Sequence, residues 1–255
     1  MLVSVLIPAY QEASTVAELL RRVLASDVAP LGFTREVLIC DDGSTDGTRE
    51  AILRVAQDHP EVRLFSHTRN QGKGASIRTL LEQARGDVVL IQDADLEYAP
   101  EDCLALLGRF QEGYDAVYGS RFLAQPHPPG MHVTHWVANR LLTATANLLY
   151  GIRISDEATC SKLIRTQLLK EMALECVGFE FCPEVTAKLS LMGIEIAEVP
   201  VSYQARDIQG GKKVRFRDGL VAMMVLAKLR LRGGSRLRSA SAARDVSDPG
   251  SEVDR

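Results

Sequence analysis

The sequence lacks the features that mark several large classes of protein. It contains no run of about eighteen apolar residues, so no transmembrane helix is predicted. Its five cysteines are scattered without a CxxC pair, which argues against zinc and redox sites. The net charge of -3 leaves no basic surplus, so we expect no nucleic-acid partner. The amino-terminal residues include neither a basic segment nor a small-residue cleavage site, so we expect a cytoplasmic protein.

The composition is that of a globular protein with one sizeable core. The chain has 255 residues, of which 46% are hydrophobic and 25% are charged. We expect one folded domain over residues 1–215 and a further helix over residues 216–232, which is apolar along much of its length and ends in basic residues. Residues 233–255 are rich in Gly, Ser, Arg and Asp, which predicts a disordered tail.

Strand and helix patterns alternate along the first half of the chain. Short apolar runs predict strands over residues 2–7, 36–40, 62–66, 87–91 and 115–119, and segments with helical spacing separate several of them. This alternation predicts an α/β domain in which helices cover both faces of a parallel sheet. The second half is less regular, with helices expected over residues 135–151 and 183–192 and a strand over residues 194–204.

Polar and acidic segments follow four of the predicted strands. They are PAYQE (8–12), Asp41–Asp42, DAD (93–95) and GSR (119–121). Ligands of an open parallel sheet bind outside the carboxyl ends of its strands, so we expect these segments to converge on one site. Crowded acids need a cation or shifted pKa values, and Mg²⁺ commonly combines one or two carboxylates with substrate phosphates. The pattern therefore predicts a hard divalent cation and a diphosphate substrate.

These motifs, taken in order, resemble glycosyltransferase family 2 from residue 3 to about residue 230. The resemblance rests on PAYQE, DDGSTDGT (41–48) and DAD, with Gln11 keeping an amide where the family has Asn. The segments GSR, DEATCSK (156–162), GFEFCPE (178–184), EVPVSY (198–203) and ARDIQGGKK (205–213) are similar to the polyprenyl-phosphate branch, which includes dolichol-phosphate mannose synthases. That branch usually has Tyr where this chain has Ser161.

The resemblance implies a GT-A fold, which is a Rossmann-like nucleotide-binding sheet, and an inverting, metal-dependent transfer reaction. A hexose would move from GDP-mannose or UDP-glucose to a polyprenyl or dolichyl phosphate at the cytoplasmic face of the membrane. Contact with the membrane would be peripheral or through a membrane-protein partner. The sequence does not select the sugar or the base.

The resemblance also implies roles for individual residues. Asp93 and Asp95 would bind Mg²⁺ or Mn²⁺, and Asp95 would be catalytic through that metal. Pro8, Tyr10, Glu12 and Asp42 would hold the base and ribose, with Asp93 facing the ribose or the metal. Arg121, Arg206 and Lys213 would bind phosphates, and Arg140 is a further candidate for the acceptor phosphate. Asp156 would position the acceptor or act as a base.

Several alternatives remain open at the level of sequence. The acceptor could be a soluble sugar, phosphoglycerate or a protein, or the chain could bind nucleotide sugars without catalysis. Nucleotidyl transfer is disfavoured because PAYQEAS is not a glycine-rich phosphate loop, and no GxGxxG follows the first strand as in dinucleotide oxidoreductases. NQGKG (70–74) is either a phosphate cradle or a tight turn. The helix over residues 216–232 either lies in a membrane interface or packs on the body.

Overall fold

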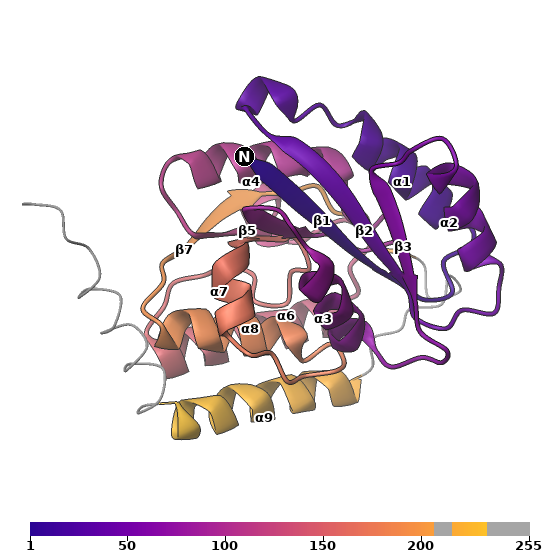
Figure 1. Ribbon diagram of the computed structural model, residues 1–255. Coiled ribbons are helices and arrows are strands. Elements are labelled where there is room, and N and C mark those ends of the chain that lie inside the picture. Colours follow the sequence, from indigo (N-terminus) through magenta and orange to yellow (C-terminus); the bar gives the residue numbers. More distant parts are fainter. Residues whose placement is uncertain (207–215, 234–255) are drawn as a thin grey trace, which may run out of the picture.

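The computed structural model describes residues 1–206 and 216–233 (Figure 1). Lys213 and nearly all of the predicted tail lie outside the described residues. The described residues form a seven-stranded sheet with the order β3-β2-β1-β4-β6-β5-β7. Its strands are β1 (Leu2–Ala9), β2 (Thr34–Asp41), β3 (Val62–Ser66), β4 (Val88–Ile91), β5 (Ala116–Ser120), β6 (Lys162–Arg165) and β7 (Ile196–Pro200). The six strands predicted from sequence are thus present.

One strand departs from the predicted parallel sheet. The pairs β1–β2, β2–β3, β1–β4 and β5–β7 are parallel, whereas β6 is antiparallel to both β4 and β5. The sequence did not predict β6, because it has only four residues and begins with a lysine. Lys162 is fully buried there. Two contacts of its amine compensate for this burial: it lies 3.4 Å from the centre of the Tyr118 ring and donates to the Glu157 carbonyl at 3.1 Å.

Helices cover both faces of the sheet, as predicted. One face packs against α1 (Val16–Ala25), α2 (Thr48–Ala56) and α4 (Cys103–Gln111), and the other against α3 (Lys73–Gln83), α7 (Thr166–Glu171) and α8 (Phe181–Leu191). The helical spacing of Leu19, Leu20 and Val23 explains why α1 buries one stripe, since all three side chains enter the first of these cores. The sheet therefore lies between two apolar layers that fix its strand ends.

Two further helices form an outer layer over α8. They are α6 (Val133–Tyr150) and α9 (Phe216–Arg232), and the bounds of α9 are the predicted ones. A separate apolar cluster joins α6, α8 and α9 through Leu142, Ala146, Ala187, Ala222 and Leu226. Because α8 is covered on both sides, nine of its eleven residues are buried. The remaining short helices are η1 (Ala29–Leu31), η2 (Pro100–Asp102) and α5 (Arg121–Ala124).

Candidate active site

The strand ends converge on one cavity, as the sequence predicted. This cavity has a volume of about 760 Å³, and its wall includes residues from the ends of β1, β2 and β4 and from the start of α5, which follows β5. The predicted site residues that line it are Pro8, Tyr10, Glu12, Asp42, Asp93, Asp95, Arg121 and Arg206. Asp156 lies behind Arg121, fully buried, and Lys213 lies outside the described residues.

Arg206 holds together the acids at one end of the cavity. Its two terminal nitrogens donate to Glu12 at 2.9 and 3.2 Å, and Nη2 also donates to Asp95 at 3.1 Å. Its backbone N–H donates to Glu97 at 3.0 Å, and Glu97 also accepts a bond from the Tyr203 hydroxyl. Arg206 was predicted to bind phosphate, and Glu12 to bind the nucleoside. In this structure they bind each other, because the converging carboxylates attract the nearby guanidinium.

The surroundings of Asp95 disfavour the ionised form of its carboxyl group. Burial, followed by the negative charges of Asp93 and Glu97, raises its pKa to about 7. The guanidinium of Arg206 offsets this effect only in part. A bound divalent cation would lower this pKa, because an adjacent positive charge favours the ionised carboxylate.

Asp93 pairs with a lysine that was not predicted as a site residue. The Lys73 amine contacts Asp93 and donates to the Cys160 sulfur at 2.8 Å. Burial opposes ionisation of Asp93, but the charge and hydrogen bond of Lys73, with a further bond from Cys160, hold its pKa below the ordinary value. Lys73 therefore places a buried positive charge beside the predicted metal acids.

The glycines around Lys73 serve close packing. A side-chain carbon added at Gly72, which has a φ of +99°, would lie 2.4 Å from the Val177 carbonyl oxygen. A carbon added at Gly74 would lie equally close to the Cys176 carbonyl oxygen. NQGKG is thus a tight turn packed against residues 176–178, and its lysine reaches into the cavity.

Asp42 anchors the same turn. Its carboxyl oxygens accept bonds from the backbone N–H groups of Gln71 and Gly72 at 2.9 and 2.8 Å. The His67 ring nitrogen Nδ1 lies 2.6 Å from Asp42 Oδ1. Asp42 still lines the cavity, so the geometry adds a positioning role to the predicted contact with the nucleoside.

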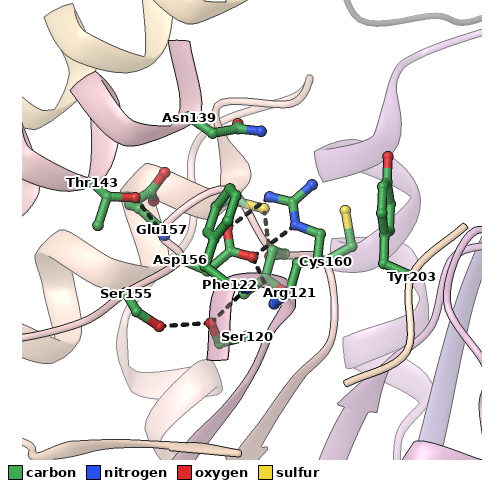
Figure 2. Close-up of polar contacts among 12 residues, drawn as sticks. Ser120, Arg121, Phe122, Asn139, Thr143, Ser155, Asp156, Glu157, Cys160 and Tyr203 are labelled. Carbon is green, nitrogen blue, oxygen red and sulfur yellow. Dashed lines mark hydrogen bonds and ion pairs between the residues drawn. The ribbon is translucent and has the colours of Figure 1, made fainter. Parts of the chain in front are cut away.

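Arg121 and Asp156 form a buried ion pair at another part of the cavity (Figure 2). Arg121 donates to the two carboxyl oxygens from Nε and Nη2, at 2.7 Å each, and its backbone N–H donates at 3.0 Å. Burial alone would lower the pKa of Arg121, but the charge of Asp156 raises it above its ordinary value. Both carboxyl oxygens of Asp156 are bound to Arg121, so Asp156 positions that guanidinium.

A second arginine lies near Arg121. The guanidinium groups of Arg121 and Arg140 lie 5.6 and 5.4 Å from the centre of the Phe122 ring. Arg140 comes from α6, whose residues Ala138, Leu141 and Leu142 line the cavity beside Ala222 and Met223 of α9. One cavity therefore combines an acidic end, the Arg121 guanidinium and an apolar wall, and Arg140 lies near Arg121 without lining the cavity.

The acidic end fits a cation that is held by few protein ligands. Among the described residues, no three His, Cys, Asp or Glu side chains form a preassembled metal cage. Burial and the nearby charge of Asp93 raise the pKa of Asp95 to about 7, which suits a cation shared with substrate phosphates. Both acids already have positively charged partners, so metal binding would require Arg206 to release Asp95.

Comparison with known proteins places the chain in a family. The sequence matches the model described as glycosyl transferase family 2 over residues 4–173, which is more than half of its length. The chain belongs to this family.

Two curated relatives are similar to this chain over two thirds or more of its length. An undecaprenyl-phosphate 4-deoxy-4-formamido-L-arabinose transferase from Pseudomonas aeruginosa is 42% identical over 172 residues, covering 67% of this chain and 49% of the relative. A dolichol-phosphate mannosyltransferase from Pyrococcus furiosus is 29% identical over 213 residues, covering 81% of this chain and 57% of the relative. This chain thus spans about half the length of these two relatives.

Solved structures show the same fold. Glucosyl-3-phosphoglycerate synthase from Mycobacterium tuberculosis, in complex with Mn²⁺, UDP and glucosyl-3-phosphoglycerate, has a TM-score of 0.64 and 24% identity. The match covers 91% of this chain and 80% of that one. The predicted GT-A fold is therefore confirmed.

Proposed function

We propose that this chain transfers a hexose from a nucleotide-diphosphate sugar to a polyprenyl phosphate. The supporting observation is that one cavity joins the acids around Asp95, the Arg121 guanidinium and an apolar wall from α6 and α9. The acids suit a donor diphosphate with its cation, the guanidinium suits an acceptor phosphate, and the apolar wall suits a lipid chain. The names of the two curated relatives include the same class of acceptor.

The donor diphosphate would bind at the acidic end. Pro8, Tyr10 and Asp42 line the part of the cavity formed by β1 and β2, where the nucleoside would lie. Asp93 and Asp95 would hold Mg²⁺ or Mn²⁺, which would neutralise the charge that develops on the leaving diphosphate. Lys73 and Arg206 add positive charge at the same place, and Arg206 would exchange its carboxylate partners for phosphate oxygens.

The acceptor phosphate would bind at Arg121. Within the described ranges, Nη1 of Arg121 makes no hydrogen bond, whereas Nε and Nη2 are held by Asp156. The Arg140 guanidinium lies 5.4 Å from the centre of the Phe122 ring and would supply a second charge. An ionised phosphate oxygen would attack the anomeric carbon as the diphosphate leaves from the opposite face, which inverts that carbon. A phosphate monoester is largely ionised at neutral pH, so positioning replaces a general base.

The apolar wall continues onto exposed surface. Leu141 of α6 and Leu220 of α9 line the cavity and are 58% and 44% exposed. Neither of these helices, nor any other in the described ranges, is long and apolar enough to cross a bilayer. We therefore propose peripheral contact, with α6 and α9 lying against the bilayer surface that supplies the lipid acceptor.

A transfer assay tests this function. The purified chain would be incubated with Mg²⁺ or Mn²⁺, a labelled donor (UDP-glucose, GDP-mannose or UDP-N-acetylglucosamine) and either a short polyprenyl phosphate or 3-phosphoglycerate. We expect label in the lipid phosphate with one donor, and a loss of about 100-fold or more in the Asp95→Ala variant. Transfer only to 3-phosphoglycerate, or full activity of Asp95→Ala in the presence of chelator, would contradict the proposal.

A further inference from the structure

Glu157 is a buried carboxyl group without a role in the proposed transfer. The residue is 0% exposed and belongs to the wall of the cavity. Neither of its carboxyl oxygens has a hydrogen-bond partner within residues 1–206 and 216–233. Unpaired buried polar groups are costly, so they are uncommon unless a ligand or water completes them.

The backbone around Glu157 is held firmly, so its side chain has a fixed origin. The Glu157 N–H donates to the Thr143 hydroxyl on α6 at 3.1 Å, as Figure 2 shows, and its carbonyl accepts from Lys162 at 3.1 Å. The nearby hydroxyl of Thr186 on α8 pairs with the Tyr118 hydroxyl at 3.1 Å and makes no hydrogen bond to the Glu157 carboxyl, although it favours the ionised form of that group. The protein thus fixes the backbone of Glu157 and leaves its carboxyl oxygens without a hydrogen bond.

Burial also sets the protonation state of this group. It raises the pKa of Glu157 to about 8, although the charge of Lys162 and, to a smaller extent, the hydroxyl of Thr186 oppose the shift. At neutral pH the group is therefore largely a neutral carboxylic acid, which can donate one hydrogen bond and accept another. A sugar hydroxyl has the same two capacities.

Glu157 belongs to a short segment whose two ends contact residues of the two proposed phosphate sites. Residue 156 binds Arg121, the proposed acceptor cation, while the Cys160 sulfur accepts a bond from Lys73, the partner of Asp93. The segment 156–160 therefore runs from the acceptor side of the cavity to the donor side. In a direct displacement the transferred sugar lies between the entering and leaving phosphates.

We infer that Glu157 determines donor specificity by hydrogen-bonding a hydroxyl or amide group of the transferred sugar. The inference rests on the proposed function, because it takes the two phosphate sites from it. A buried group that is built to pair with a substrate hydroxyl strongly rejects analogues that lack it, since it is then left unpaired. Glu157 would thus select the sugar, while the metal acids select the diphosphate.

The test compares Glu157→Leu and Glu157→Gln with the wild-type chain. We expect Glu157→Leu to lower kcat/KM for the preferred sugar donor by about 10- to 100-fold. Affinity for the nucleoside diphosphate without sugar, measured by calorimetry, should stay unchanged, because Glu157 would not touch it. A set of donors would each lack one sugar hydroxyl. For the donor that lacks the hydroxyl bound by Glu157, kcat/KM of the wild type should fall by the same factor, whereas kcat/KM of Glu157→Leu should not fall further.

Glu36→Gln provides a matched control. Glu36 is also a buried carboxyl, 8% exposed, but it lies on β2 away from the cavity and bonds to Ser4 and to the backbone of Arg85. We expect this variant to change the free energy of unfolding without changing the preference among donors. If Glu157→Leu does not fold, the nearly isosteric Glu157→Gln still tests the inference, because its amide group donates two hydrogen bonds where the neutral acid donates one and should therefore change the preference among donors.

Three results would overturn the inference. Unchanged donor preference in both Glu157 variants, with an active wild type, would refute the inference alone. Equal weakening of sugar donors and of the free nucleoside diphosphate would give Glu157 a structural role instead. A wild-type chain that neither binds nor uses UDP-glucose, GDP-mannose or UDP-N-acetylglucosamine would refute the proposed function, and the inference with it.

Discussion

Asp156 illustrates how a single carboxylate supports a ligand-facing cation. It is 0% exposed, and Arg121, which lines the cavity, takes up both of its oxygens. The Glu198 carboxylate in turn accepts bonds from the backbone N–H groups of Ser155 and Asp156, which fixes the loop. The chain thus orients Arg121 before any ligand arrives.

This arrangement predicts a large stability cost when Asp156 is neutralised. Asp156→Asn should lower the free energy of unfolding by about 3–5 kcal/mol, because it leaves the buried Arg121 charge uncompensated. The exposed pair of Arg21 and Glu18 is the control, and Glu18→Gln should cost less than about 1 kcal/mol. Urea unfolding at neutral pH measures both. An Asp156→Asn variant as stable as the wild type would show that the ion pair does not hold Arg121.

Glu157 predicts a pH dependence of folding. Its pKa is raised from 4.5 to about 8 in the folded chain, so between these values the folded state holds a proton that the unfolded state has released. The contribution of Glu157 to the free energy of unfolding is therefore fully present below pH 4.5. It is lost as the pH rises toward 8, by at most about 1.4 kcal/mol per pH unit.

The matching measurement compares Glu157→Gln with the wild type by urea unfolding at several pH values between 5 and about 8. Because glutamine does not titrate, the variant should gain stability relative to the wild type as the pH rises. A difference that stays constant across this range would mean that Glu157 is already ionised in the folded chain.

Sequence patterns reached the acids and arginines of the site but not all of their partners. Asp93, Asp95 and Arg121 follow strands in recognisable motifs, so their convergence was predictable. Lys73 was visible only as part of a glycine-rich turn, and its pairing with Asp93 depends on packing between distant segments. Glu157 lies in the segment DEATCSK, but its burial was not predictable, because it depends on the position of α6 and α8 around it.

At the scale of elements, α6 and α9 present apolar residues to solvent as well as to the core. Leu148 of α6 and Met224 of α9 are 85% and 61% exposed. Both helices also contribute residues to the buried cluster over α8. Each helix therefore has apolar residues beyond those that its packing needs, which suits an interfacial position.

We expect the protein to float with vesicles of phosphatidylethanolamine and phosphatidylglycerol. The double change Leu148→Gln with Met224→Gln should weaken this binding by about tenfold or more, because two apolar side chains no longer enter the interface. Leu53→Gln on α2, where the leucine is 42% exposed, is the control and should bind as the wild type does. An equal loss of vesicle binding in the control, or no vesicle binding by the wild type, would exclude Leu148 and Met224 as the membrane contact.

At the scale of the whole molecule, most of the sheet could be predicted from the sequence. Six of the seven strands were predicted because each is an apolar run next to turn residues. β6 was missed because a four-residue segment that begins with a buried lysine resembles a loop. Its antiparallel direction follows from tertiary pairing with β4 and β5, which local patterns do not encode.

Ligand binding should stabilise this whole unit. A donor at a hundred times its Kd raises the free energy of unfolding by about 2.7 kcal/mol, which corresponds to a rise in Tm of about 5 °C or more. Thermal unfolding would be followed with UDP-glucose or GDP-mannose, each with Mn²⁺, Mg²⁺ or EDTA. We expect one donor to act only with metal. An equal shift in EDTA would show that Asp93 and Asp95 do not need a cation to hold the diphosphate.

The place of β6 between β4 and β5 has a consequence for synthesis on the ribosome. β4 lies between β1 and β6 in the sheet, so one of its edges stays unpaired until residue 165 has emerged from the exit tunnel. Until then the nascent chain presents an open hydrogen-bonding edge along Val88–Ile91. Translational pauses before this point would lengthen the time in which that edge can recruit a chaperone or another nascent chain.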